Sequence, residues 1–411
     1  MINALVRRTE KIIRTDILYA IRGLFWFGLQ HAGSAVGGLA VSVIFANFLP
    51  KETYGLYRYA LSVFSILMLS NIARADDSLS ISVANGYEGD FLNICKARMK
   101  WGLLGSLAGL GLALYWFLRG EHILAHMGLL MAAFVPFFEP PMTYNGFLIG
   151  KRRFKKMSVI GTVINAAYSI AIATTVLLSR NPIFLLASYL ITNTLLRMAM
   201  LAYVVKSEKP NARRDDRTLS YGKKLSVIEI FSAISGQIDS ILLFHYIGPA
   251  EVAAYTFIKR IPEQIKFIPK YLTALSTPKF STKDISDPYI KRETMWKSVV
   301  LFFLLLGCAL VYIACAPLIF KYLFKPYQQY VQLSQIFSLS MPLNFGGLFL
   351  NFIETSRRED IVFKLNILSP VSRILIIFFS IHFFGLAGLV WGFLASRLVV
   401  TLWRAYFFYK A

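Results

Sequence analysis

The chain has 411 residues, of which 56% are hydrophobic, and it carries a formal net charge of +22. With 34 Phe and 21 Tyr and a mean hydropathy of +0.56, it has more apolar surface than one soluble core can bury. These values exclude an ordinary soluble domain and indicate a polytopic membrane protein. The basic excess could also indicate a nucleic-acid partner, but Lys and Arg in cytoplasmic loops explain it without one.

Apolar stretches long enough to cross a bilayer as helices recur along the whole chain. We therefore predict an all-α polytopic membrane protein with about twelve transmembrane helices. The predicted spans are roughly 23–48, 54–73, 99–118, 123–149, 157–179, 182–205, 225–247, 251–272, 297–320, 330–353, 361–383 and 386–408. Prolines 140 and 141 should interrupt the fourth span, and prolines 262 and 269 the eighth, because proline removes a backbone donor.

The basic residues outside these spans are distributed unequally between the two sides of the membrane. Nearly all lie in one alternate set of connections; the other set holds Lys51, Arg119, Arg180, Lys321 and Lys325. The positive-inside rule then places both termini in the cytoplasm. Because every loop is too short for a domain of ordinary size, we expect the activity to lie within the membrane.

Residues 239–270 form an unusual stretch, with two predicted spans joined by Gly248-Pro249-Ala250. The second span carries Lys259, Arg260, Glu263 and Lys266. In a continuous helix, Lys259, Glu263 and Lys266 would share one face. A central Lys or Arg costs roughly 2.5–3.5 kcal/mol to insert, so such a face is expected to line a cavity or meet a partner.

Bases outnumber acids inside the predicted spans. The bases are Arg58, Arg197, Lys259, Arg260, Lys266, Arg373 and Arg397, and the acids are Glu139, Glu229, Asp239 and Glu263. If most of them face a shared cavity, its positive potential would suit an anionic passenger such as a phosphate or pyrophosphate group. Alternatively, the bases pair with acids or extend to an interface. Asp239, Glu139 and Glu263 are the candidates for ion coupling, with charge neutralisation as the competing interpretation.

No cofactor or metal site is predicted. Cys95, Cys308 and Cys315 form no metal-binding or disulfide pattern, and His122 and His126 have no third ligand nearby. The segment GFLIGK has too few residues between its glycines and lacks the final Ser or Thr of a phosphate-binding loop. Energy is therefore expected from an ion gradient or from the gradient of the passenger.

One short pattern occurs in both halves of the chain. Pro50-Lys51-Glu52 followed by Tyr57 resembles Pro249-Ala250-Glu251 followed by Tyr255, and basic residues follow both tyrosines. An internal repeat of this kind is typical of transporters. It predicts two six-helix bundles, residues 1–210 and 211–411, around a central cavity.

These features resemble the polysaccharide-unit flippases (Wzx-type) of the multidrug/oligosaccharidyl-lipid/polysaccharide exporter superfamily. The resemblance rests on twelve spans in two halves, the segment FLPKETYGLYRYA at 48–60, its counterpart at 237–255 and the basic eighth span. The first turn differs from its counterpart by one extra residue before Gly55.

The resemblance implies a V-shaped cavity that works by alternating access in the bacterial inner membrane. The passenger would be an oligosaccharide unit on undecaprenyl pyrophosphate, moved from the cytoplasmic to the periplasmic leaflet for O-antigen, lipopolysaccharide or capsule synthesis. It assigns pyrophosphate and sugar contacts first to Arg58, Lys259, Arg260 and Lys266, and then to Arg197, Arg373 and Arg397. Membrane lipids and other polysaccharide-assembly proteins are further candidate partners.

Three alternatives remain open on the sequence. An ion-coupled multidrug or organic-cation antiporter of the same fold should line its cavity with acids and aromatic residues. A membrane enzyme such as a polysaccharide polymerase needs a sizeable outer loop, which this chain lacks. A scaffold for glycan assembly would retain glycan export after substitution of Lys259 and Arg260.

Overall fold

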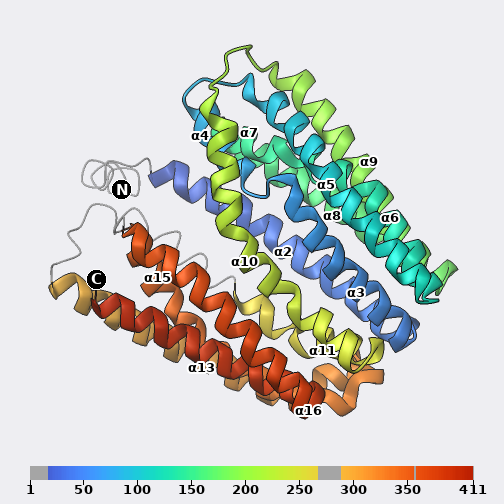
Figure 1. The fold of residues 1–411 in the computed structure, drawn as a ribbon. Coiled ribbons are helices and arrows are strands. Elements are labelled where there is room, and N and C mark those ends of the chain that lie inside the picture. The colour runs from blue at the N-terminus through green and yellow to red at the C-terminus, as the bar shows by residue number, and fades with distance from the viewer. Residues whose placement is uncertain (1–16, 267–287, 356–357, 411) are drawn as a thin grey trace. The chain divides into compact units, whose positions relative to one another are not determined.

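A computed structural model describes residues 17–266, 288–355 and 358–410 (Figure 1). Within these ranges the regular elements are helices. The α-helices are α2 (Ile17–Phe48), α3 (Lys51–Leu67), α4 (Ala75–Ala84), α5 (Asp90–Leu118), α6 (His122–Phe138), α7 (Tyr144–Gly150), α8 (Phe154–Leu178), α9 (Pro182–Glu208), α10 (Arg217–Tyr246), α11 (Pro249–Arg260), α13 (Pro288–Leu323), α14 (Val331–Ser338), α15 (Gly347–Thr355) and α16 (Glu359–Lys410). The 3-10 turns are η1 (Met68–Asn71), η2 (Pro140–Thr143), η3 (Pro262–Lys266), η4 (Lys325–Tyr330) and η5 (Pro342–Gly346).

Nine helical stretches in the described residues are long and apolar enough to cross a membrane, and the bent pair around α3 and α4 makes up to ten. The longest, α16, is broken at Gly385, which has φ 60°. Its two arms match two of the predicted spans, 361–383 and 386–408. The prediction of an all-helical membrane protein is confirmed.

Prolines interrupt the helices at 140, 141 and 262, as the sequence indicated, and at one further place, whereas Pro269 lies outside the described residues. The fourth predicted span is divided into α6, η2 and α7. The tenth is divided at Pro342, which begins η5. The continuous helix through Lys259, Glu263 and Lys266 is not present, because α11 ends at Arg260 and η3 follows from Pro262. Glu263 nevertheless acts electrostatically on Lys259. Pro262 cannot donate a helical hydrogen bond, and its ring crowds the preceding turn.

The described residues form two compact units by contact. The first contains residues up to Ser42, Ser70–Ser179 and Phe184–Ser226. Within it, α5 and α6 lie side by side (Figure 1). Helix α4 packs on α7, where Gly146 and Gly150 face the backbone of α4 closely. Their core is apolar and includes the stacked rings of Phe91 and Phe147.

The second unit contains Val43–Leu69, Arg180–Ile183 and the described residues from Val227 onward. Here α3 packs against α11, the two helices that carry the repeated Pro-x-Glu pattern. Tyr57 and Tyr255 are both buried, at 1% and 0% exposure. The repeated segments are therefore neighbours in one unit. These contact units do not test the predicted bundles 1–210 and 211–411, which stay a prediction.

The connection between α9 and α10 is docked on the first unit. Glu88 accepts hydrogen bonds from Lys151 Nζ at 2.5 Å and from the backbone N–H of Asn211 at 3.1 Å. Burial acts to raise the pKa of Glu88, but the hydrogen bonds from Lys151 and Asn211 outweigh it and hold the pKa below its usual value. Next to it, Asp90 accepts a bond from Thr218 at the start of α10, 2.7 Å away.

The docking of this connection should weaken in acid. Because the folded-state pKa of Glu88 is lowered, its contribution is complete above the unperturbed pKa of roughly 4.3 and is lost as the pH falls through the lower folded-state value. A spin label on Ala212→Cys, in a background without Cys308 and Cys315, should become more mobile over that window. In Glu88→Gln the label should already be mobile at pH 7. An immobile label at every pH in both proteins would contradict the assignment.

Candidate functional site

A buried ion pair joins two helices of the second unit. Arg373 on α16 donates to both carboxylate oxygens of Asp239 on α10, at 2.7 and 2.9 Å. The side chain of Asp239 is 3% exposed and that of Arg373 is 18% exposed. The hydroxyl of Tyr255 on α11 donates to the same carboxylate at 2.7 Å. Asp239 is thus held by a cation and a neutral donor from two different helices.

Aromatic rings extend this network in two directions. On one side, Lys259 Nζ lies 4.4 Å from the centre of the Tyr255 ring. On the other, the guanidinium groups of Arg373 and Arg397 lie 5.3 and 5.2 Å from the centre of the Phe393 ring. Cation–π contacts of this kind hold cations without neutralising them. Four residues named from the sequence, Asp239, Lys259, Arg373 and Arg397, therefore meet in one network.

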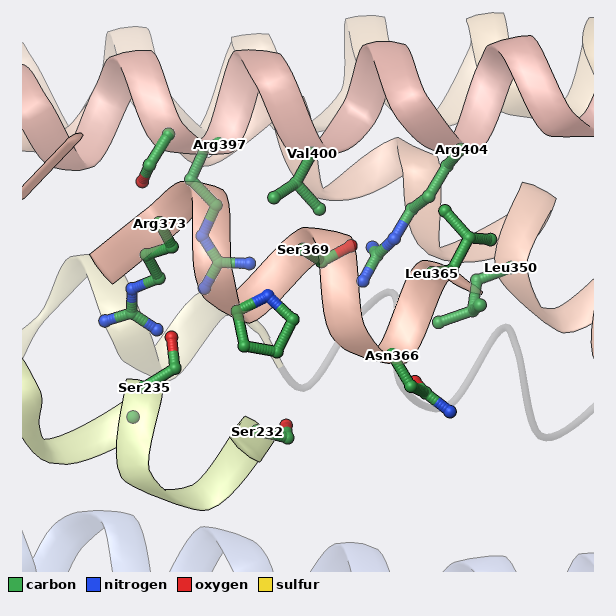
Figure 2. A pocket seen from close by; sticks show the side chains of 13 residues that line it. Ser232, Ser235, Leu350, Leu365, Asn366, Ser369, Arg373, Arg397, Val400 and Arg404 are labelled. Atoms are coloured by element: carbon green, nitrogen blue, oxygen red, sulfur yellow. The ribbon is translucent and has the colours of Figure 1, made fainter. Parts of the chain in front are cut away.

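The network borders a cavity of about 360 Å³ in the second unit, at the lower end of the range for small-molecule sites. Figure 2 shows Arg397 and Arg404 on the second arm of α16, and Arg373, Ser369 and Asn366 on its first arm. The cavity is lined by Ser232, Ser235, Gly236, Leu350, Leu365, Asn366, Ser369, Pro370, Arg373, Ser396, Arg397, Val400 and Arg404. Sequence reasoning missed Arg404, which was counted with the cytoplasmic tail although it lies within the last predicted span, 386–408.

The cavity carries a positive charge that its own walls do not cancel. Arg373 is neutralised by Asp239. Among the described residues no ion pair of Arg397 or Arg404 is found, although Glu354, outside the lining, acts electrostatically on Arg404. Guanidinium groups present paired N–H donors that match the oxygens of a phosphate or carboxylate. The serine hydroxyls and the Asn366 amide add neutral donors and acceptors. This lining can bind an oxygen-rich anion.

The other predicted residues of this unit lie near the network but not in the cavity lining. Arg58 on α3 interacts electrostatically with Lys259 on α11, and its buried Nε has no hydrogen-bond partner in the described chain. Arg260 ends α11 and Glu263 lies in η3. The side chain of Lys266 lies outside the described residues.

Two predicted residues, Arg197 and Glu139, lie in the first unit. Arg197 donates to the carbonyl of Phe138 at 3.0 Å, and its guanidinium lies 4.1 Å from the centre of that ring. Glu139 lies 3.5 Å from Arg98. Arg197 thus contacts Phe138, the residue directly before Glu139. Both predicted residues lie in a different unit from the arginine cavity.

Arg98 is the residue that sequence reasoning most clearly misplaced, since it was counted in a cytoplasmic loop. It lies inside α5, with a side chain 2% exposed. It donates to Asp76 at 2.9 Å, to Thr143 at 3.2 Å and to the backbone carbonyl of Asn71 at 3.0 Å. A buried arginine needs such partners. In the sequence, only the acid Glu139 inside a predicted span indicated that a buried base should lie nearby.

The fold is shared with solved transporters. A MATE transporter in complex with MaD5 matches with a TM-score of 0.65 and 13% identity, over 97% of each chain. The lipid II flippase MurJ, in its inward closed conformation, matches with a TM-score of 0.63 and 12% identity, over 95% of this chain and 87% of that one. A mutant of the Vibrio cholerae MATE transporter VcmN matches with a TM-score of 0.62 and 14% identity, over 95% and 96%.

These likenesses show the fold, an all-helical membrane fold shared with the MATE transporters and MurJ, and the predicted fold class is confirmed. Residues 20–281, more than half of the chain, match the family described as polysaccharide biosynthesis protein. The chain belongs to this family, which confirms the predicted family. A search of curated proteins gives no match.

Proposed function

We propose that this protein is a flippase for a lipid-linked, anionic oligosaccharide of the undecaprenyl-pyrophosphate type. The observation that carries the proposal is the cavity of the second unit, which brings Arg373, Arg397 and Arg404 together with serine and asparagine side chains. Membership of a polysaccharide biosynthesis family supports a glycan-linked passenger.

The arginines of the cavity have two different roles in this proposal. Arg397 and Arg404 meet the pyrophosphate, because charge-assisted hydrogen bonds to phosphate are stronger than neutral ones. Arg373 is committed to Asp239 at 2.7 Å and positions the cavity wall. Ser369, Asn366 and their neighbours offer hydrogen bonds to sugar hydroxyls.

The remaining assignments belong to the same proposal. The passenger moves from the cytoplasmic to the periplasmic leaflet of a bacterial inner membrane, both termini are cytoplasmic, and the glycan serves O-antigen or capsule synthesis. Lys259, Arg260, Lys266, Arg58 and Arg197 assist binding along the path. Asp239, Glu139 and Glu263 are the candidates for ion coupling.

The test is transbilayer movement of a labelled undecaprenyl-pyrophosphate oligosaccharide in reconstituted vesicles. The double variant Arg397→Gln/Arg404→Gln should lower the initial rate at least tenfold, since each lost charged hydrogen bond is worth roughly 1.5–3 kcal/mol. Arg397→Lys/Arg404→Lys should recover part of the rate, because lysine keeps the charge but lacks the fork of donors.

The matched control is Arg119→Gln/Arg180→Gln, which removes the same charge from two exposed positions. It should transport at the native rate. The proposal fails if the native protein moves cationic dyes but not the lipid-linked glycan, because that result would identify an organic-cation antiporter. It also fails if the cavity and control variants lose activity equally.

A further inference from the structure

A second cavity, of about 490 Å³, lies in the first unit where α9 ends and α8 begins. We call it the basic pocket; its walls include Arg152, Arg153, Lys155 and Lys156, with Tyr203 and Glu208 from α9. Glu208 pairs with Lys156 at 2.7 Å and lies 3.8 Å from Arg153. Among the side chains that line the pocket, four are basic and one is acidic, so the lining is mainly basic.

An apolar groove of about 550 Å³ begins beside the basic pocket and runs between α2 and α8. It is lined mainly by small and apolar side chains, among them Trp26, Gly33, Val36, Val159 and Val163. The valines are far from buried, at 71% for Val36 and 45% for Val159 and Val163. On candidate membrane spans, such exposed apolar surface faces acyl chains.

Two contacts join the basic pocket to the apolar groove. Val159 lines both cavities. Lys155 lines the pocket, and its Nζ lies 5.2 Å from the ring centre of Trp26, which lines the groove. The combined site therefore has a cationic end at the beginning of α8 and an apolar end farther along the same helix.

We propose that the basic pocket and the apolar groove together bind an anionic membrane phospholipid, with its phosphate among Arg152, Arg153 and Lys155 and an acyl chain between α2 and α8. The charge of the pocket and the lining of the groove match the two ends of such a lipid. The site is formed by other helices than the arginine cavity, so the proposal is independent of the transported substrate.

Trp26 provides the readout, because it lies where an acyl chain would pass. The full-length protein has six tryptophans, so the Trp26 signal is the difference between the native protein and Trp26→Phe. In phosphatidylcholine bilayers, equal small amounts of chain-brominated phosphatidylglycerol or phosphatidylcholine are added as quenchers. We expect the Trp26 signal to be quenched more strongly by the phosphatidylglycerol.

Two pairs of matched variants separate the parts of the site. Arg152→Gln/Arg153→Gln/Lys155→Gln should lower the preference for phosphatidylglycerol at least tenfold, since one basic residue near a membrane surface changes affinity about fivefold. Lys209→Gln/Arg213→Gln/Arg214→Gln removes the same charge from exposed residues outside the pocket and should keep the preference. Gly33→Leu, which fills the groove, should reduce quenching, whereas Gly28→Leu, on the same helix but outside the groove, should not.

Equal quenching of native Trp26 by the two lipids would overturn the proposal. So would a preference that survives the pocket variant, or one that the control variant loses to the same extent. Displacement of both quenchers only by added lipid-linked pyrophosphate would overturn it too, because the occupant would then be the transported substrate.

Discussion

Replacing Arg98 by alanine is expected to lower the free energy of unfolding by about 3 kcal/mol, because it leaves two half-buried carboxylates without their cation. The substitution removes the donor to Asp76, Glu139, Thr143 and the Asn71 carbonyl together. The carboxylate side chains of Asp76 and Glu139 keep 30% and 37% exposure. Because solvent reaches both carboxylates, the expected loss of stability lies at the lower end of the range for a broken buried ion pair.

Thermal unfolding of the purified protein in detergent measures this effect. Arg74→Ala is the matched control, since its pair with Asp77 has side chains 46% and 50% exposed, and such surface pairs contribute roughly 0–1 kcal/mol. Arg98→Lys should fall between the two, because it keeps the charge but cannot bond to all partners at once. If Arg98→Ala melted at the same temperature as Arg74→Ala, the contacts of Arg98 would contribute no more to stability than an exposed ion pair.

The second large effect is expected at Gly55, where the backbones of α3 and α11 lie close together. A Cβ atom at Gly55 would overlap the backbone carbonyl of Pro249. Backbone cannot rotate away as a side chain can, so Gly55→Ala must separate the helices. It would also disturb the ring contact between Tyr54 and Phe257, whose centres lie 5.1 Å apart. We expect a loss of about 2–3 kcal/mol, at the upper end for overpacking.

The same substitution at Gly111 of α5 is the control. A Cβ there would meet nothing within 4 Å, and alanine is the better helix former by about 1 kcal/mol. Gly111→Ala should therefore melt at or above the native temperature, and Gly55→Ala well below it. Two variants with unchanged melting temperatures would show that α3 and α11 are not in close contact in the protein as purified.

Hydropathy predicted the uninterrupted helices well, because a long apolar segment in a membrane can hardly adopt any structure other than a helix. The interruption at Pro262 was predicted, but not that the α-helix would end there, because membrane helices often continue through proline when neighbours satisfy the freed carbonyl. The division at Pro342 was missed for a related reason: an apolar window says nothing about backbone hydrogen bonds.

The site was predicted as a set of interior charges, but not as a set of contacts. Asp239 and Arg373 are 134 residues apart, and nothing in the sequence pairs them in preference to other interior charges. Arg98 was assigned to a loop because its helix extends beyond the apolar window, whereas Arg404 lies within the last predicted span and was counted with the tail. Helix α5 begins at Asp90, well before the predicted start at 99. Long side chains can remain inside a helix end when a cavity or a carboxylate receives them.

The packing of α3 on α11 has a consequence for synthesis. On its own α3 does not pass as an apolar span; it does so only together with α4. About 200 residues separate Tyr54 from its partner Phe257, so at 5–20 residues per second α3 leaves the ribosome about 10–40 s before α11. During that interval Tyr57 and Arg58 lack the neighbours that later pack around them. A temporary partner must therefore stabilise α3 in the membrane during this interval. The second unit is complete only after α11 has been inserted and has packed against α3.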